Sequence, residues 1–271
     1  MGWHHRWAFR VLGGRLPRPE GCLSGTQLRL SWWNLIPNLG DAVSPLIVSH
    51  LSGRTVVRAP DRARGKLLAC GSILNRARDG DVVWGSGFIS EEARPDGSRI
   101  LVTAVRGPRT AARLRGLGIE CPDVFGDPGC LLPRLFPRPA RAVPRFALGV
   151  IPHHADQELL ALRDPAIRII DILASPEDFL TALWECERVV SSSLHGIIFA
   201  EAYGIPAQWL VMSGRVLGEG HKFADYYEGT GRERPEPLTL QGIFKETDWR
   251  PPAAGAADRL ASVFPFPGAT R

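Results

Sequence analysis

The chain has 271 residues, of which 44% are hydrophobic and 23% charged, enough for one large domain or two modest ones with a buried core. The net charge is +5 and the positive excess is mostly arginine, which suits flat anions such as phosphate and carboxylate. The sequence has no CxxC pair, no apolar run that could cross a membrane, and no basic block interleaved with aromatic residues. These features disfavour a disulfide framework, a structural zinc site, a transmembrane helix and nucleic-acid binding, and they favour the cytoplasm.

Strands of the first half are predicted where short apolar runs stop at glycine, serine or a turn. Residues 1–28 mix charges into their apolar stretches, so we expect an irregular segment there and not a signal peptide. A helix is expected after the NLGD stretch, with Asp41 or Ser44 as its cap, Pro45 in its first turn and Gly53 at its end. The other elements are strands within 28–34, 66–74 and 81–89, a strand and an arginine-rich helix in 98–119, and a strand with an Asp-Pro-Gly turn in 124–136.

The second half is predicted to follow a proline-rich hinge at 133–144. Its clearest helix signal is Ser175 as cap, with Pro176 in the first position and Asp178 three residues after the cap. Further strands are expected within 145–156, 166–173, 188–193 and 206–212, and further helices over 175–187, 194–204 and 253–264.

Strands and helices alternate in both halves, which predicts an α/β fold of parallel sheets with helices on both faces. We expect two such domains facing each other across a cleft. The predicted division is an irregular segment over 1–28, an N-terminal domain over 29–138 and a C-terminal domain over 139–271, whose last helix packs back.

The stretch SSSLHG (191–196) is the strongest candidate site, because it leads from a predicted strand into a helix. A helix start offers free backbone N–H groups and partial positive charge to an anion, and small serines let a phosphate approach. His195 would add a donor or a proton. The alternative is a buried, hydrogen-bonded histidine that holds a turn, and spacing alone does not decide between the two.

Other candidates lie at predicted strand ends, where open parallel sheets bind their ligands. Asp41 reads as a base or as a helix cap, and Arg106 is a better candidate anion ligand than the solvated Arg109. Lys222 lies in a polar, glycine-rich loop where a mobile cation could close over an anion or simply remain solvated.

His153 and His154 lack a third metal ligand at helical spacing, so a zinc site is not expected there. The Gly-Ser loops at 71–72 and 85–86 are expected to let substrate pass close to the backbone.

The sequence resembles the polysaccharide pyruvyl transferases over roughly residues 30–230, most closely those of bacterial exopolysaccharide pathways. The resemblance is carried by NLGDAVSP (38–45), VWGSGF (83–88), AVRGPRT (104–110), GDPG (126–129), IPHHAD (151–156), SSSLHGIIFAEAYGIPA (191–207) and HKFADYY (221–227). It implies two Rossmann-like domains similar to the GT-B glycosyltransferases. It also implies transfer of the enolpyruvyl carbons of phosphoenolpyruvate to two hydroxyls of one sugar, with release of phosphate.

The same resemblance implies roles for individual residues. It puts the acid role on His195. From the expected mechanism, Asp41 or another group across the cleft orients or deprotonates the acceptor. Phosphoenolpyruvate is expected at Arg106, His154, Ser193, Leu194 and Lys222, and the acceptor sugar at Asn38, Gly40 and Ser86. No cofactor is expected beyond the donor, and metal dependence and oligomeric state stay open.

One position departs from the family pattern, because Ser193 stands where many relatives have an arginine two residues before the histidine. His154, Arg106 or Lys222 is then expected to supply the missing charge. Two alternatives remain: a GT-B glycosyltransferase that uses a nucleotide sugar, and a non-catalytic protein that binds an anionic sugar. The acceptor is expected to be a sugar or a lipid-linked oligosaccharide, which is compatible with peripheral association at the inner membrane face.

Overall fold

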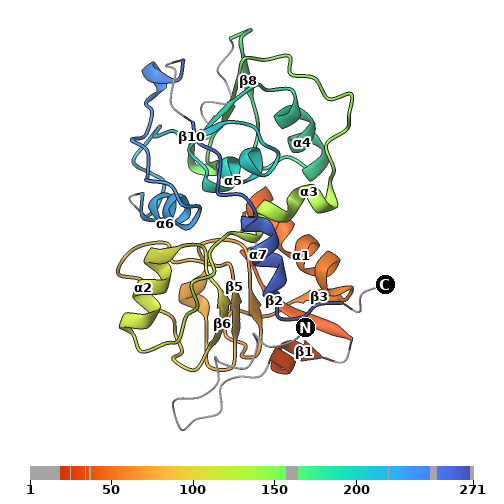
Figure 1. Cartoon of the computed structure of the whole chain (residues 1–271), viewed down its shortest axis with the longest axis vertical. Coiled ribbons are helices and arrows are strands. Elements are labelled where there is room, and N and C mark those ends of the chain that lie inside the picture. The colour runs from red at the N-terminus through yellow and green to blue at the C-terminus, as the bar shows by residue number, and fades with distance from the viewer. Residues whose placement is uncertain are drawn as a thin grey trace.

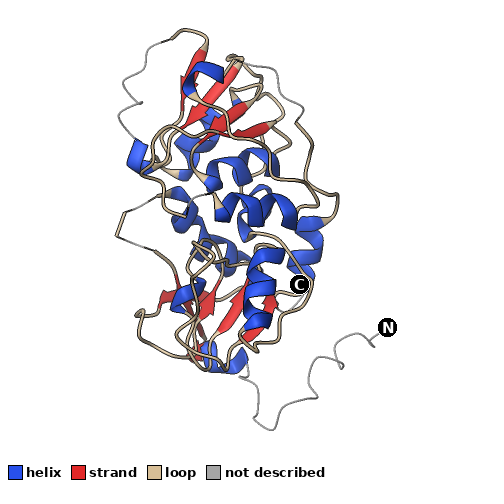
Figure 2. Cartoon of the chain, turned by 90° about the vertical axis from the view of Figure 1, so that its left-hand side faces the viewer, coloured by secondary structure: helices blue, strands red, loops and turns tan. Residues whose placement is uncertain are grey.

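The computed structural model describes residues 19–24, 26–33, 35–36, 38–156, 164–218, 220–244 and 249–268. Two β-sheets form the two halves of an elongated molecule, with strands β1 to β6 in one half and β7 to β10 in the other (Figure 1). Helices lie between the sheets and along their outer faces (Figure 2). The predicted α/β class is therefore confirmed.

The first sheet has six strands in the order β1-β2-β4-β5-β6, with β3 also paired to β2. Its pairings are parallel except for β1 with β2. The central strand β5 is buried along its whole length, as expected for a parallel strand covered on both faces. The bounds are β1 Leu23–Ser24, β2 Gln27–Ser31, β3 Thr55–Arg58, β4 Leu67–Leu68, β5 Val82–Trp84 and β6 Leu101–Ala104.

Helix α1 (Leu39–Ser52) begins where the Asn38 side chain accepts a hydrogen bond from the Asp41 amide. It ends at Gly53, whose left-handed backbone (φ 63°) closes the last turn, as predicted. The predicted caps Asp41 and Ser44 are wrong, and Pro45 lies inside the helix, beyond its first turn. The other helices of this half are η1 Pro19–Cys22, η2 Leu74–Arg76, α2 Pro108–Gly116, η3 Pro128–Leu131 and α3 Leu132–Leu135.

The second sheet has four strands in the order β10-β9-β7-β8, and all of its pairings are parallel. Ser175 caps α4 by accepting a hydrogen bond from the Asp178 amide, which confirms the predicted start signal. The strands are β7 Leu148–Ile151, β8 Ile167–Ile169, β9 Val189–Ser191 and β10 Ala207–Trp209. The helices are α4 Pro176–Trp184, α5 Leu194–Ala202, α6 His221–Gly229, η5 Leu240–Gly242 and α7 Ala256–Ser262.

A continuous apolar core joins the two halves. One cluster of buried residues includes Val43 of α1 and Ile197 of α5. Helix α7 lies against the first half (Figure 1), where the Trp84 indole N–H donates to the Leu260 carbonyl at 2.9 Å. The two halves are therefore packed together, and the C-terminal helix α7 packs against the first sheet.

Four segments differ from the predictions made from the sequence. The strand predicted within 124–136 is reduced to a single bridge between Val105 and Phe125, and η3 follows it. The described part of 1–28 carries η1 and β1, because Leu23 and Ser24 pair antiparallel with β2. Strand β3 was not predicted, since its four residues give too short an apolar run. Helix α6 occupies the stretch around Lys222 that was expected to be a loop. The segment from α3 to β7 links the halves, and its action as a hinge stays a prediction.

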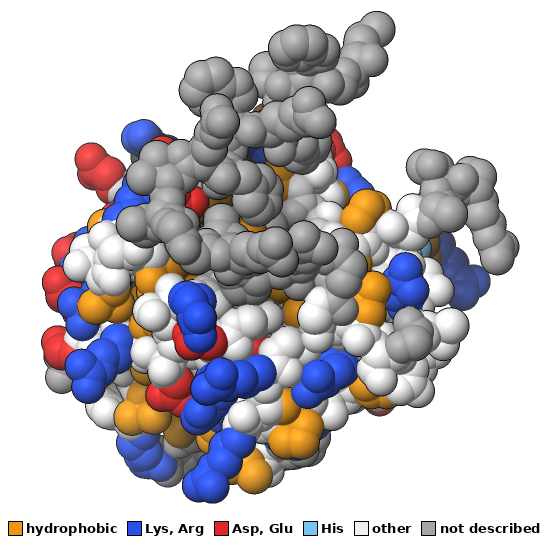
Figure 3. All heavy atoms as spheres, turned by 90° about the horizontal axis from the view of Figure 1, so that it is seen from below, with side chains coloured by type: hydrophobic (Ala, Val, Ile, Leu, Met, Phe, Trp, Pro, Cys, Tyr) orange, Lys and Arg blue, Asp and Glu red, His pale blue; other side chains and the backbone are white. Residues whose placement is uncertain are grey.

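In the face that Figure 3 displays, basic side chains are interspersed with acidic and hydrophobic ones and form no continuous basic surface outside the grey atoms. Among the described residues, no helix combines the length and apolar character that a membrane crossing requires. The same residues contain no group of three histidine, cysteine or acidic side chains arranged to hold a metal ion.

Candidate active site

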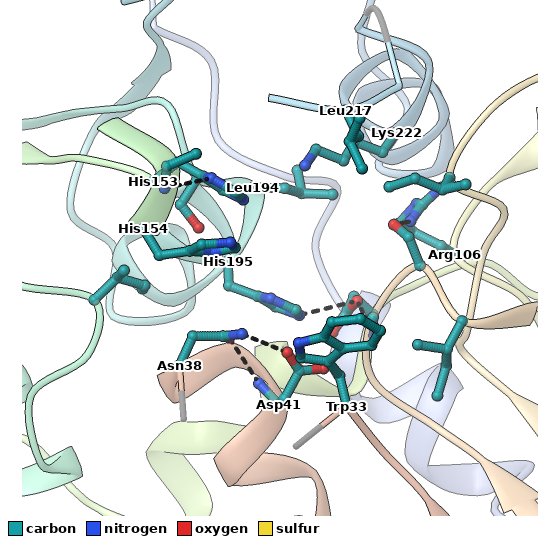
Figure 4. A pocket seen from close by; sticks show the side chains of 18 of the residues that line it. Trp33, Asn38, Asp41, Arg106, His153, His154, Leu194, His195, Leu217 and Lys222 are labelled. Carbon is teal, nitrogen blue, oxygen red and sulfur yellow. Dashed lines mark hydrogen bonds and ion pairs between the residues drawn. The ribbon is translucent and has the colours of Figure 1, made fainter. Parts of the chain in front are cut away.

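A cavity of about 430 Å³ lies between the two halves. It is lined by the segments that follow β4, β6, β7 and β9, so the carboxyl ends of strands from both sheets face it, as expected for parallel sheets. Eight of the predicted site residues line this cavity, several of them drawn in Figure 4: Asn38, Asp41, Arg106, His154, Ser193, Leu194, His195 and Lys222.

His195 is the second residue of α5 and follows β9 closely. Its ring stacks on Phe199, with 5.6 Å between the ring centres. Its Nε2 lies 3.7 Å from Asp127 Oδ2 and is buried without a hydrogen bond among the described residues. A buried ring nitrogen that faces a carboxylate suits an imidazole that holds or moves a proton.

Asp127 was not predicted as a site residue, although its GDPG turn was noted. Its carboxylate is 1% exposed and accepts a hydrogen bond from the Gly129 amide at 2.9 Å. Burial alone would raise the pKa of Asp127, but the contact with His195 and the Gly129 amide outweigh it and the pKa is lowered. Asp127 therefore stays ionised beside His195 and can stabilise a positive charge on the ring.

Asp41 lies in the first turn of α1, and its carboxylate accepts a hydrogen bond from the Asn38 amide group. Because Asn38 provides the helix cap, the Asp41 carboxylate is left to face the cavity (Figure 4). Burial raises the pKa of Asp41, while the nearby His195 and Asn38 oppose part of this rise. A carboxylate with a raised pKa is a better proton acceptor than an exposed one.

Lys222 enters the cavity from α6 (Figure 4). The residue is 7% exposed, and its ammonium lies 5.5 Å from the centre of the Phe223 ring. Within the described part of the chain it forms no hydrogen bond or ion pair. Burial, and next the positive charge of Arg106, lower its pKa to about 8. The side chain is thus fixed on a helix and not carried on a mobile loop, and it still offers an uncompensated cation to the cavity.

His153 and His154 form one wall, with their ring centres 4.0 Å apart. Burial and the Lys222 charge lower the pKa of His153 to about 3 and also lower that of His154. The prediction that His154 could replace the missing arginine charge is therefore not supported. A neutral ring can still donate a hydrogen bond to an anion.

Arg106 borders the cavity but directs much of its hydrogen bonding to the protein. Its side chain is 0% exposed and bonds Asp225 at 3.0 Å, the Ser72 hydroxyl at 2.6 Å and the Phe88 carbonyl at 2.6 Å. It was predicted as an anion ligand, and the structure ties it to both halves while leaving it in the cavity wall, so its contact with the donor stays a prediction. Arg109 pairs at the surface with Glu228 and does not line the cavity.

Two predicted acceptor residues lie behind the cavity wall. A Cβ on Gly40 would overlap the His195 ring, so Gly40 provides room for that ring. Ser86 is 0% exposed and donates to the Gly71 carbonyl at 2.9 Å. Of the two Gly-Ser loops, Gly71 and Ser72 line the cavity, whereas the loop at 85–86 makes room for protein groups, because a Cβ on Gly85 would overlap the Pro128 ring.

Ser193 is the N-cap residue of α5 and makes no side-chain cap bond. Its own amide is taken by the Ser191 hydroxyl at 3.0 Å. The first amides of α5 therefore receive no cap from Ser193 and lie at the cavity with Leu194. The start of α5 thus keeps free amides of the kind that bind anions, and the anion site expected from the SSSLHG stretch stays a prediction.

Comparisons with known proteins agree with the sequence resemblance. The sequence profile of the polysaccharide pyruvyl transferase family matches residues 31–212. An uncharacterized protein of Acanthamoeba polyphaga mimivirus is 32% identical over 179 residues, which cover 61% of this chain and 60% of that protein. The chain thus spans about 60% of the length of this curated relative. No solved structure matches the chain. Helix α6 lies beyond the matched range, so the placement of Lys222 in the site rests on geometry.

Proposed function

The chain belongs to the polysaccharide pyruvyl transferase family, and we propose that it transfers pyruvate from phosphoenolpyruvate to two hydroxyls of one sugar as a ketal. The observation that carries this proposal is the pairing of His195 with a buried, ionised Asp127 in a cavity that also holds the uncompensated Lys222. The site combines a proton source with a cation, which are the two groups that this donor needs.

The donor is an anion, and we place it between Lys222 and the start of α5. The Lys222 ammonium and the free amides around Leu194 supply positive charge and N–H donors to its phosphate and carboxylate. His154 contributes a neutral ring donor. Ser193 leaves room for the donor where relatives of the family carry an arginine.

The chemistry begins when His195 gives a proton to the methylene carbon of phosphoenolpyruvate, which leaves a cationic centre at the adjacent carbon. One sugar hydroxyl attacks this centre and loses its proton to Asp41. Phosphate then departs with the electron pair of its carbon–oxygen bond and takes the proton from Asp41, which regenerates that carboxylate. The second hydroxyl closes the ketal, and its proton returns the imidazole to its starting state. Asp127 stabilises the charged ring while it carries the proton.

The family supports a polysaccharide acceptor, and we propose that the sugar enters from the side of the first half. Trp33 lines the cavity mouth there, with the Arg76 guanidinium 4.7 Å from its ring centre. Indole faces are common platforms for sugar rings. We further propose that both halves are Rossmann-like in a GT-B-like arrangement, that no cofactor is needed, and that the enzyme acts in the cytoplasm on an exopolysaccharide or its lipid-linked precursor.

Phosphate release from phosphoenolpyruvate tests this proposal, measured with purified protein and a panel of oligosaccharide acceptors. We expect acceptor-dependent release that falls about 100- to 10,000-fold in His195→Ala, the usual contribution of a general acid. His50→Ala is the matched control, because His50 is an exposed histidine of α1 outside the cavity.

Two outcomes would redirect the proposal. Thermal stabilisation by a nucleotide sugar but not by phosphoenolpyruvate would favour a glycosyltransferase. Tight binding of phosphoenolpyruvate without phosphate release would favour a non-catalytic binding protein. The serine at 193, in place of the arginine of many relatives, is the feature that favours this alternative.

A further inference from the structure

The two halves are joined beside the cavity by a buried ion pair between Arg106, which follows β6, and Asp225 in α6. Both side chains are 0% exposed. The Asp225 carboxylate also accepts hydrogen bonds from the Thr110 amide at 2.9 Å and the Thr110 hydroxyl at 2.7 Å. Each carboxylate oxygen thus has a donor, which a buried charge requires to remain ionised without a large cost.

The backbones of the two halves meet at the same joint. A Cβ on Gly107 would overlap the Asp225 carbonyl, and a Cβ on Gly229 would overlap the Arg106 carbonyl. Gly107 has an extended backbone (φ −164°), so glycine is needed there for space and not for conformation. Helix α6 therefore sits directly on the loop between β6 and α2, and the ion pair lies at the same joint.

Lys222 lies three residues before Asp225 on α6, so the two side chains share one face of the helix. Asp225 takes the side toward Arg106, while Lys222 reaches the cavity. The position of the Lys222 ammonium is consequently set by where Asp225 holds the helix. Lys222, the cation that faces the donor, belongs to the second half. Arg106, to which Asp225 ties the helix, belongs to the first half.

We propose that Asp225 is a positioning residue for the donor site, which holds α6 against the first half and offsets the Arg106 charge so that the Lys222 ammonium faces the donor. This rests on the proposed function, since Lys222 is assigned there to phosphoenolpyruvate. Asp225 itself does not line the cavity and needs no contact with substrate.

The charge balance gives this role a distinctive signature. The groups that interact electrostatically with the Lys222 ammonium come from different elements: Arg106, Asp156, Asp41, His153 and His154. Among these groups, Arg106 is the one whose charge Asp225 offsets. Replacing Asp225 by asparagine leaves Arg106 uncompensated. The Lys222 ammonium should then lose its proton at a lower pH, which a purely structural role for Asp225 would not predict.

The experiment compares Asp225→Asn with Glu228→Gln. Glu228 is the matched control because it lies one turn further along α6 and pairs with Arg109 at the surface. Isotope-labelled lysine allows Lys222 to be titrated by NMR, since Lys66 and Lys245 are the other lysines of the chain. Calorimetry with phosphoenolpyruvate on the same samples gives the donor affinity.

We expect Asp225→Asn to shift the Lys222 titration to lower pH and to weaken phosphoenolpyruvate binding about tenfold, the scale of a lost charged hydrogen bond. Glu228→Gln should change neither. A folded Asp225→Asn protein with both values unchanged would overturn the positioning role. If Asp225→Asn does not fold, Thr110→Val removes one hydrogen bond from the same carboxylate. It should weaken donor binding severalfold, and unchanged affinity would equally overturn the proposal.

The same data separate this inference from the proposed function. If wild-type protein does not bind phosphoenolpyruvate but the Lys222 titration still follows Asp225, the proposed donor is wrong and the positioning of Lys222 stands. If phosphoenolpyruvate binds and neither value depends on Asp225, the donor stands and the positioning role fails.

Discussion

Two buried lysines of the described chain sit in opposite surroundings. Lys66, just before β4, is 0% exposed and donates to Asp81 at 2.6 Å, to the Ala63 carbonyl at 2.7 Å and to the Arg76 carbonyl at 3.3 Å. Lys222 is almost as buried, yet in the described residues its ammonium has no such acceptor. The first lysine is satisfied by the fold, whereas the second faces an open cavity.

This difference separates a structural cation from a functional one. Burying an ammonium costs free energy unless the group is paired and hydrogen-bonded. An unpaired buried ammonium is therefore expected where a bound ligand supplies the missing negative charge and acceptors. Lys66 meets that requirement through its own loop and through Asp81. Lys222 meets it only when an anion enters the cavity. The same substitution at the two positions should therefore have effects of opposite sign on stability.

Lys66→Met should have the largest effect. It leaves the Asp81 carboxylate buried without its cation, which typically costs about 3–5 kcal/mol of unfolding free energy. Denaturant unfolding of the purified variant measures this loss. The double variant Lys66→Met, Asp81→Asn should recover part of it, because no buried charge is then left unpaired and the asparagine oxygen still accepts from one of the Lys66 and Arg78 amides. A loss below about 1 kcal/mol in the single variant would show that the pair contributes no more than a surface ion pair.

Lys222→Met should reverse the pattern. Removing an unpaired buried ammonium should leave the unfolding free energy unchanged or raise it by about 1 kcal/mol. Phosphoenolpyruvate binding should weaken about 10- to 100-fold, the scale of a lost charged hydrogen bond in a buried site. Unfolding curves and calorimetric titration of the same preparation test both statements. Full donor affinity in Lys222→Met would remove this residue from the donor site.

The sequence predicted those site residues that lie next to an element boundary. His195 and Asp41 were found because each follows a strand and begins a helix, where the order of the elements alone brings each residue to the carboxyl edge of its own sheet. The helix signals of α4 were equally local and were confirmed. Local rules suffice for these residues, because their position depends on neighbours in the chain.

The contacts that the sequence did not predict connect residues far apart in the chain. Asp127 faces His195 from the other half. Arg106 forms an ion pair with Asp225, which cannot be predicted from the position of Arg106 at the end of a strand. Lys222 was assigned to a loop because glycines precede it, but packing against Gly107 stabilises a helix there. In these cases tertiary contacts outweigh the local preference of the sequence. A single sequence carries no signal for such contacts.

The pH dependence of donor binding is the smallest expected effect and the closest test of the contrast between the two lysines. The pKa of Lys222 is lowered from 10.5 to about 8, so the free protein loses this positive charge as the pH rises through about 8. The phosphate of the donor is fully ionised above about pH 7, since its second pKa is near 6. Donor affinity should therefore be level near pH 7, where the phosphate is ionised and Lys222 is protonated, and fall by up to about tenfold per pH unit above 8.

Stability should move the other way over the same range. Between about pH 8 and 10.5 the unfolded chain keeps a proton on Lys222 that the folded chain has released, so this group makes the unfolding free energy rise with pH. Both trends should disappear in Lys222→Met, which has no proton to lose. If the affinity of Lys222→Met keeps the wild-type pH dependence, the titrating group lies elsewhere. The unpaired ammonium would then be no more functional than the paired one at Lys66.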